Sequence, residues 1–529
     1  MRSRSRAALA GVVAASVALA VGELVTAFDD AGPSLVSSVG DRLVDRLSGP
    51  LKDVAVTWFG TNDKVALVIG IIVVALAVGA LLGTLTQERT WVGPVGFAAF
   101  GVLGWSSYRS APLTSETVGA AAAVAAAAAG AAALVALVRW GGLVERDQPR
   151  PLPVDGVAVG GQIERPPGPG SGAPGGASRR AFFGAAATLG VGAAGTALLA
   201  RQLRGADPLA TFRADTALPE STTPVTVPRT QPFSEPGLSP YLTPNDDFFR
   251  IDTALVTPRV DPASWRLEVS GLVDRPFSLD FDELLGLDAV EVPVTLQCVS
   301  NEVGGDLVGN ARWHGVPLAT VLDRAGVRPE GTQVIGRAVD GWTAGFPTEL
   351  LDDGRTALVA YGMNGELLPS RHGFPARLIV AGLYGYVSAT KWLTEIELTR
   401  LEEVDGYWIP RGWAKEGPIK TASRIDVPRA GTELPAGPVA VAGVAWAPTS
   451  GITAVELRVD DGPWASCTLG AAASDETWVQ WHHVWEARPG DHLLTVRAVD
   501  GDGETQTDAV APPRPDGATG HHARRVSVS

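Results

Sequence analysis

The stretch TLQCVSNEVGGDLVGNARWHGVPL, Thr295–Leu318, contains Cys298, one of only two cysteines in this 529-residue chain. A strand-like TLQC segment leads there into a loop rich in glycine and asparagine. Four roles are open to this cysteine: a buried structural thiol, a catalytic thiolate, half of a disulfide, or one thiolate ligand to a soft metal.

The rest of the sequence does not support these four roles of Cys298 equally. No Cys–His catalytic signature is evident, and Cys467 lies far along the chain in a region of different composition, so we do not assume a disulfide. Zinc would need three or four closely spaced ligands, and none cluster around Cys298. A lone thiolate is sufficient for a metal only if a cofactor supplies the other ligands.

The composition divides the chain into two regions. Residues 1–200 are dominated by Ala, Val, Leu and Gly, whereas the remainder has the composition of a soluble protein. The length predicts several domains. The net charge of −14 argues against nucleic acid as a partner, because phosphate binding needs clustered Lys and Arg.

Apolar runs of about 20 residues, the length of a membrane span, recur in the first region. Four of them cover Ala7–Phe28, Val65–Leu85, Trp91–Tyr108 and Val118–Val138. A fifth run, Ala181–Ala200, follows a Pro/Gly-rich segment. We therefore expect a four-span transmembrane region over 1–140, a cytoplasmic linker over 141–180 and a fifth span over 181–203.

The distribution of Lys and Arg predicts the orientation of these spans. The N-terminus reads MRSRSR, and the segment 139–180 carries six arginines, so both are expected in the cytoplasm. Five crossings then place everything after about residue 205 outside. The predicted location is the cell membrane, multi-pass, with an extracytoplasmic C-terminal half.

The segment SRRAFF, Ser178–Phe183, resembles a twin-arginine export signal, in which paired arginines precede an apolar run. Alternatively, Arg179 and Arg180 only anchor a helix at the cytoplasmic face. All seven histidines follow residue 300, and the membrane region has no Met beyond the initiator. Because axial haem ligands are His, Met, Cys or Tyr, bis-His haem is excluded there, and we expect no haem on this chain.

Three zones follow the last apolar run. Residues 204–240 are rich in Pro, Thr and Ser and are predicted to be a linker. Residues 241–426 mix strand-like segments such as WRLEVSGLV with short helices such as PLATVLDRAG, which Gly326 closes, and this predicts an α+β domain. Residues 427–529 show only strand patterns such as AVELRVD, which predict an all-β immunoglobulin-like sandwich with Cys467 as a small buried thiol.

Ordered motifs in this half resemble the sulfite oxidase family of molybdenum enzymes. TLQCVSN followed by ARWHGVPL is one motif. The run MNGELLPSRHGFPARLIVAGLYGYVSATKWL, Met363–Leu393, is similar to the family's MNG-x-x-LP…HGFP-x-R…KW run, and TPNDDFFRID, Thr243–Asp252, to its N-terminal pterin-binding stretch. The resemblance covers Tyr241–Ser529. It implies a molybdopterin-binding oxidoreductase domain over 241–426 and an Ig-like dimerisation domain over 427–529.

By this resemblance, Cys298 is the thiolate ligand to the metal of a molybdenum–molybdopterin cofactor. The implied cofactor-binding residues are Asn301, Arg312, His372, Arg377 and Lys391. An anionic phosphate favours forked and ammonium donors, which Arg377 and Lys391 supply. Taken alone, these two would be solvated surface charges, and His372 would be a loop histidine with its hydrogen bonds satisfied.

The chain departs from the family at the substrate pocket. Arg250 and Arg514 match two arginines of the family's sulfite site, but Val303 occupies the position of a third. Trp413, in YWIPRGW, replaces the family's active-site tyrosine, and Asp252 replaces a histidine. Each lost charge-assisted contact weakens dianion binding by about 1.5–3 kcal/mol, and a Trp face prefers apolar or cationic groups. We therefore expect Arg250, Trp413 and Arg514 to serve a substrate less charged than sulfite, such as an organic sulfoxide.

The expected activity is oxygen-atom transfer on a small extracytoplasmic substrate by a membrane-anchored enzyme that is not a typical sulfite oxidase. Electrons would pass through a separate carrier, either a cytochrome or a membrane redox partner, and the resemblance suggests a homodimer. Two alternatives stay open: a sulfite dehydrogenase, and a cell-surface binding protein that keeps the fold without the metal.

Overall fold

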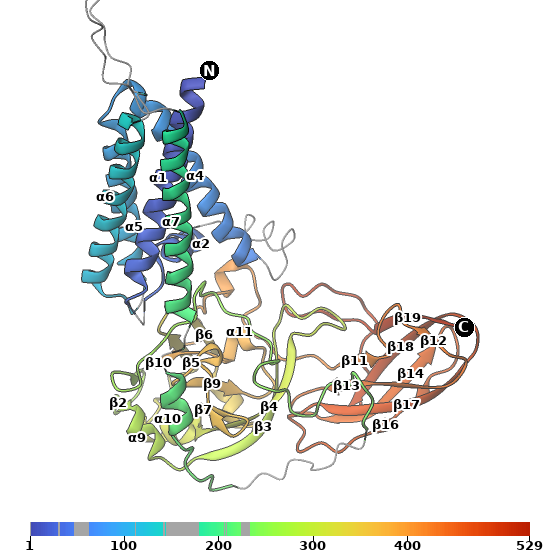
Figure 1. Ribbon diagram of the computed structural model, residues 1–529. Coiled ribbons are helices and arrows are strands. Elements are labelled where there is room, and N and C mark those ends of the chain that lie inside the picture. Colours follow the sequence, from blue (N-terminus) through green and yellow to red (C-terminus); the bar gives the residue numbers. More distant parts are fainter. Residues whose placement is uncertain are drawn as a thin grey trace, which may run out of the picture. The chain divides into compact units, whose positions relative to one another are not determined.

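The computed structural model separates into two compact units, Met1–Ala206 and Asp207–Ser529 (Figure 1). The residues that it describes are 2–29, 32–46, 63–111, 113–140, 143, 179–205, 207, 209–223 and 233–529. Nearly all of the predicted cytoplasmic linker over 141–180, and part of the predicted linker over 204–240, lie outside the described residues.

The first unit is helical (Figure 1). Its helices are α1 (Arg2–Thr26), α2 (Leu35–Arg46), α4 (Asp63–Glu88), α5 (Val92–Tyr108), α6 (Glu116–Trp140) and α7 (Arg179–Gly205). Small residues allow close packing, since a Cβ on Gly11 of α1 would lie only 1.9 Å from the carbonyl oxygen of Gly79 on α4. Phe97, Leu134 and Phe182 belong to the buried core of this bundle.

Four of these helices are long and apolar enough to cross a membrane. They cover Arg4–Thr26, Lys64–Glu88, Glu116–Trp140 and Arg180–Leu203. The third predicted span, Trp91–Tyr108, does form a helix, but α5 has only 17 residues, against the roughly 20 of a typical span. Length and composition therefore support four spans in the described part of the chain, where the sequence predicted five.

The N-terminal half of the second unit contains two sheets. The first has the order β2-β1-β10-β5-β6, with β1 (Arg266–Gly271), β2 (Phe277–Asp280), β5 (Gln333–Ala338), β6 (Thr343–Pro347) and β10 (Leu393–Thr399). The second has the order β3-β4-β7-β8, with β3 (Val290–Gln297), β4 (Val308–Pro317), β7 (Ala357–Met363), β8 (Glu366–Leu367) and, paired with β7, β9 (Arg377–Val380).

Short helices lie between these strands: α9 (Phe281–Leu285), α10 (Leu318–Ala325) and α11 (Gly385–Ser388). Another short helix, α8 (Ala210–Asp215), precedes the first strand. α9 begins with a capping box in which Asp280 and Glu283 satisfy each other's backbone N–H groups. α10 ends at Gly326, whose φ of +68° allows the left-handed helix cap that the sequence predicted. The sheet-rich domain expected after residue 240 is confirmed.

The C-terminal region is built from two further sheets (Figure 1). One contains β11 (Ala422–Val427), β13 (Gly437–Trp446), β16 (Thr468–Leu469) and β17 (Val479–Ala487). The other contains β12 (Glu433–Leu434), β14 (Ile452–Val459), β15 (Ala465–Ser466), β18 (Gly490–Asp500) and β19 (His522–Val528). Val441 and Trp481 of the first sheet share one buried core with Leu457 and Val496 of the second. The predicted β-rich region is thus present; its immunoglobulin-like character stays a prediction.

Candidate active site

Cys298 follows the last residue of β3, where the chain leaves the sheet. Its backbone N–H donates to the carbonyl of Leu307 at 2.9 Å, and its own carbonyl accepts from the N–H of Asn301 at 3.0 Å. Burial raises the pKa of the thiol, while hydrogen bonds from Ser300 and the charge of Lys391 act in the opposite direction. Without a metal, the buried thiol therefore stays protonated at neutral pH.

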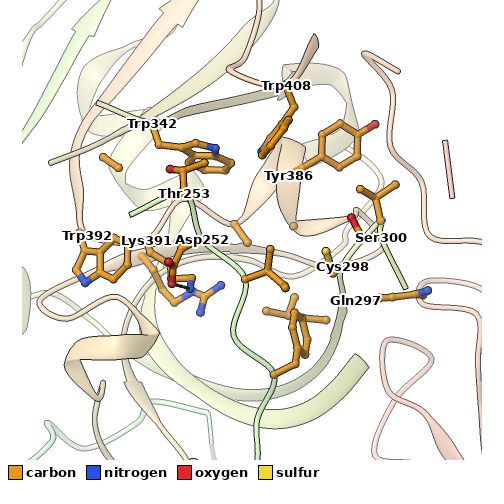
Figure 2. Close-up of a pocket in the computed structure, with 18 of the residues that line it drawn as sticks. Asp252, Thr253, Gln297, Cys298, Ser300, Trp342, Tyr386, Lys391, Trp392 and Trp408 are labelled. Carbon is orange, nitrogen blue, oxygen red and sulfur yellow. Dashed lines mark hydrogen bonds and ion pairs between the residues drawn. The ribbon is translucent and has the colours of Figure 1, made fainter. Parts of the chain in front are cut away.

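The thiol lies in the wall of a cavity of about 140 Å³ (Figure 2). The aromatic residues that line the cavity are Phe248, Phe249, Trp342, Tyr386, Trp392, Trp408 and Trp413. Figure 2 shows Trp342, Trp408 and Tyr386 along one side, and Asp252 beside Lys391 on another. The charged residues of the lining are Asp252, Asp340, Arg377 and Lys391.

Three aromatic rings support one another at one side of the cavity. The ring centroids of Trp413 and Tyr386 are 5.9 Å apart, and those of Trp413 and Trp408 are 6.5 Å apart at a nearly perpendicular 77°. The Tyr386 hydroxyl donates to the carbonyl of Ala414 at 2.7 Å, which fixes its ring. The Cys298 cavity is therefore bordered by apolar ring surface.

Buried cations lie in the same lining. The Lys391 ammonium is 3.2 Å from the Asp252 carboxylate, and both side chains are almost inaccessible to solvent. Burial lowers the pKa of Lys391 to about 8, although Asp252 acts in the opposite direction. The guanidinium of Arg377 donates through Nη1 to the His372 carbonyl at 3.0 Å and lies 5.0 Å from the Trp313 ring, and burial lowers its pKa to about 9.

The other predicted cofactor residues lie outside the lining. His372 is buried, its Nε2 is 2.8 Å from the carbonyl of Asn245, and burial lowers its pKa to about 3, so it is a neutral donor to that carbonyl. Asn301 accepts from the Leu307 N–H at 2.9 Å and closes the loop after Cys298. Arg312 is 3.3 Å from Glu291.

The predicted substrate residues are only partly brought together. Trp413 lines the cavity beside the cysteine. Arg250 is not part of the lining, and its Nε is 2.9 Å from the Asp252 carboxylate. Arg514 is exposed and donates to the main-chain carbonyl of Arg411 at 2.8 Å, so it too lies outside the lining.

Several cavity residues were not predicted from the sequence. Asp340 and Trp342 come from the turn between β5 and β6, a segment without a recognised motif. Burial raises the pKa of the Asp340 carboxyl, and the nearby Asp252 adds to this effect. The sequence does contain a signal for Tyr386 and Trp408, because they lie within GYVSATKW and YWIPRGW, two stretches similar to motifs of the sulfite oxidase family.

The lining suits an anionic, metal-binding cofactor. The Nε of Arg377 is buried and has no hydrogen-bond partner among the residues that the structure describes. An unpartnered guanidinium N–H and a buried ammonium are the donors that a phosphate would satisfy. The cysteine adds one soft ligand, as a metal otherwise held by a dithiolene requires.

Comparison with known proteins agrees with this chemistry. The family described as "Oxidoreductase molybdopterin binding domain" matches residues 254–408. The "Uncharacterized oxidoreductase YuiH" of Bacillus subtilis is 38% identical over 159 residues, which cover 30% of this chain and 76% of that protein. Mitochondrial sulfite oxidase of Rattus norvegicus is 30% identical over 51% of this chain, and the match spans 58% of that enzyme.

Among solved structures, the sulfane dehydrogenase SoxCD from Paracoccus pantotrophus aligns with a TM-score of 0.49 at 23% identity. The alignment covers 56% of this chain and 86% of the solved chain.

Proposed function

Because this chain belongs to the sulfite oxidase family of molybdopterin-dependent oxidoreductases, we propose that it uses a molybdenum cofactor in the Cys298 cavity for oxygen-atom transfer with a weakly charged organic substrate. When bound, the cofactor supplies a metal that exchanges an oxygen atom and two electrons with the substrate. The residues of this chain bind it, orient the substrate and provide protons.

Each cavity residue has a role in this proposal. Cys298 ligates the metal as a thiolate, because a thiol that coordinates a metal ion gives up its proton. Arg377 and Lys391 bind the pterin phosphate. Reduction of a sulfoxide consumes two electrons and two protons and releases a sulfide and water. We propose Asp340 as the residue that delivers protons, because its carboxyl lies in the same cavity and burial raises its pKa.

The observation that carries the choice of substrate is the aromatic lining next to Cys298. Arg250 is committed to Asp252, and Arg514 to main-chain carbonyls, so neither contributes a guanidinium to the lining. Rings of this kind bind apolar or cationic groups, whereas a dianion such as sulfite needs several cations. We therefore propose a neutral sulfoxide or a similar small oxo compound.

A direct assay tests this choice. The full chain is produced in a host that makes the cofactor, its molybdenum content is measured, and reduction of a methyl aryl sulfoxide is compared with oxidation of sulfite. We expect kcat/KM for sulfite to be lowered by about ten- to a hundredfold for each lost charge-assisted contact. Efficient sulfite oxidation would instead support the sulfite dehydrogenase. A folded protein that takes up no molybdenum would support the non-catalytic binding protein.

We also propose that the first unit anchors the enzyme in the cell membrane. Four helices have the required length and apolar composition, and large apolar side chains such as Ile69, Val74 and Val191 are exposed on them. Such surfaces are rare in water and ordinary in lipid. Four crossings from a cytoplasmic N-terminus would return the chain to the cytoplasm, so the extracytoplasmic active site that we propose requires α5, the 17-residue apolar helix, as a fifth crossing. The arginine distribution favours this orientation, and the paired Arg179 and Arg180 favour twin-arginine export.

Topology reporters fused after residue 529 test the side of the membrane, and an Arg179→Lys/Arg180→Lys variant tests the route. An active cytoplasmic reporter would contradict the proposed orientation. The partners that we propose are a separate electron carrier and a second copy of this chain, the latter through an Ig-like C-terminal domain.

A further inference from the structure

The loop between Cys298 and β4 is closed at its base and turns sharply at its tip. Its base is held by the bonds between Cys298, Asn301 and Leu307 described above. At its tip, the N–H of Gly305 donates to the carbonyl of Glu302 at 2.9 Å, and Gly304 has a φ of +78°. Movement of the tip would therefore be transmitted directly to the backbone of the cysteine.

Two side chains of the C-terminal sheets contact this tip. Arg424 on β11 donates through Nη1 to the carbonyl of Gly305 at 2.8 Å. His522 on β19 packs against Gly304 so closely that a Cβ there would lie 2.2 Å from the His522 Cδ2. We refer to Arg424 and His522 as the contact pair.

The contact pair is itself fixed by its neighbours. The Arg424 guanidinium is 2.6 Å from Asp426 through Nε and donates to the Ser239 hydroxyl at 2.8 Å through Nη2, and its side chain is only 9% exposed. His522 accepts the N–H of Ile425 through Nδ1 at 2.9 Å, so its proton is on Nε2. Both side chains thus reach the loop in a single defined orientation.

We propose that the contact pair consists of positioning residues for Cys298: through them, the C-terminal sheets hold the loop in the conformation that presents the thiol to the cavity. The role as metal ligand rests on the proposed function, whereas the control of loop geometry does not. Without the pair, the loop would populate open conformations that expose the sulfur more often.

Thiol labelling of the cofactor-free full chain in detergent, in a Cys467→Ser background, tests the positioning. The test variants are Arg424→Met and His522→Leu. The matched controls are Arg525→Met, on β19, and His521→Leu, directly before β19. Arg525 is exposed, and His521 instead lies 2.9 Å from the Gln506 carbonyl. We expect maleimide to react with Cys298 about ten- to a hundredfold faster in the test variants than in the controls.

A third variant, Gly304→Ala, disturbs the same contact from the loop side and leaves the sheets unchanged, so it is informative even if Arg424→Met does not fold. It should also accelerate labelling. Equal labelling rates in folded test and control variants would overturn the proposal. In cofactor-loaded protein, the thiolate-to-metal absorption should shift in the test variants only. A chain that binds no molybdenum at all would refute the proposed function, while the labelling result would still decide the loop contact.

Discussion

Replacing Asp252 by Asn removes the carboxylate that neutralises a buried lysine. The side chains of Asp252 and Lys391 are 5% and 11% exposed, and their charged atoms are 3.2 Å apart. Removing one partner of such a buried pair typically costs about 3–5 kcal/mol. The more exposed Arg250 pair adds at most about 1 kcal/mol. We expect the free energy of unfolding to fall by at least about 3 kcal/mol when no cofactor is bound.

The loss should depend on pH in a defined direction. Burial already lowers the pKa of Lys391 from its ordinary 10.5 to about 8, and loss of Asp252 lowers it further. A lysine with a lowered pKa in the folded state binds fewer protons than in the unfolded state. Stability therefore rises as the pH increases from the folded-state pKa toward 10.5. The loss of unfolding free energy in Asp252→Asn should be complete below the folded-state pKa of Lys391 in the variant. It should diminish at alkaline pH, where Lys391 is neutral.

The assay is denaturant unfolding of the cofactor-free full chain in detergent, followed by tryptophan fluorescence. Asp340→Asn is the matched control, because this carboxyl lines the same cavity and has a pKa raised by burial. An asparagine oxygen can still accept the Trp342 N–H, which lies 3.1 Å from the Asp340 carboxylate, so we expect a change within about 1 kcal/mol. Equal losses in the two variants would refute the assignment of the Asp252–Lys391 pair as a stabilising element.

Three other predictions concern the cofactor and the C-terminal sheets. Cys298→Ser should remove the thiolate-to-metal absorption of the cofactor-loaded protein, whereas Cys467→Ser should retain it; equal spectra in both variants would show that Cys298 is not the thiolate ligand. Arg377→Met should lower the pterin content of the purified protein at least tenfold, while Arg371→Met, which changes a more exposed guanidinium paired with Asp246, should not. Because burial lowers the pKa of His522 to about 4, the stability that it contributes is complete above its ordinary value of 6.5 and is lost as the pH falls through about 4. His522→Gln should flatten the dependence of the unfolding free energy on pH between about 4 and 6.5. An unchanged profile would show that titration of His522 does not contribute to it.

Local sequence signals predicted the elements around the site well. The strand-like TLQC segment supplies the last three residues of β3 and then Cys298, Gly326 ends α10, and the alternation in HLLTVRAVD matches β18. These outcomes depend on neighbours within a few residues, where periodicity and cap chemistry determine the conformation. The motif around Arg377 and Lys391 likewise brought two cations into the cavity lining.

The direction of long side chains could not be predicted in the same way. Arg250 and Arg514 were predicted to be pocket arginines, but nearby acceptors at Asp252 and Arg411 bind their guanidinium groups. Trp342 reaches the cavity from a turn between two strands of another sheet, and only the assembled fold brings it there. Such contacts depend on tertiary geometry, which neither periodicity nor spacing encodes.

The contact of β19 with the Cys298 loop has a consequence for biosynthesis. During translation, the cysteine leaves the ribosome long before His522 is added, so the loop is made without the strand that supports it. The Cys298 thiol then reaches its final geometry only after the C-terminal sheets have formed. Cofactor insertion should accordingly follow the folding of β19, and ribosome-bound chains stalled before residue 522 should not retain the pterin.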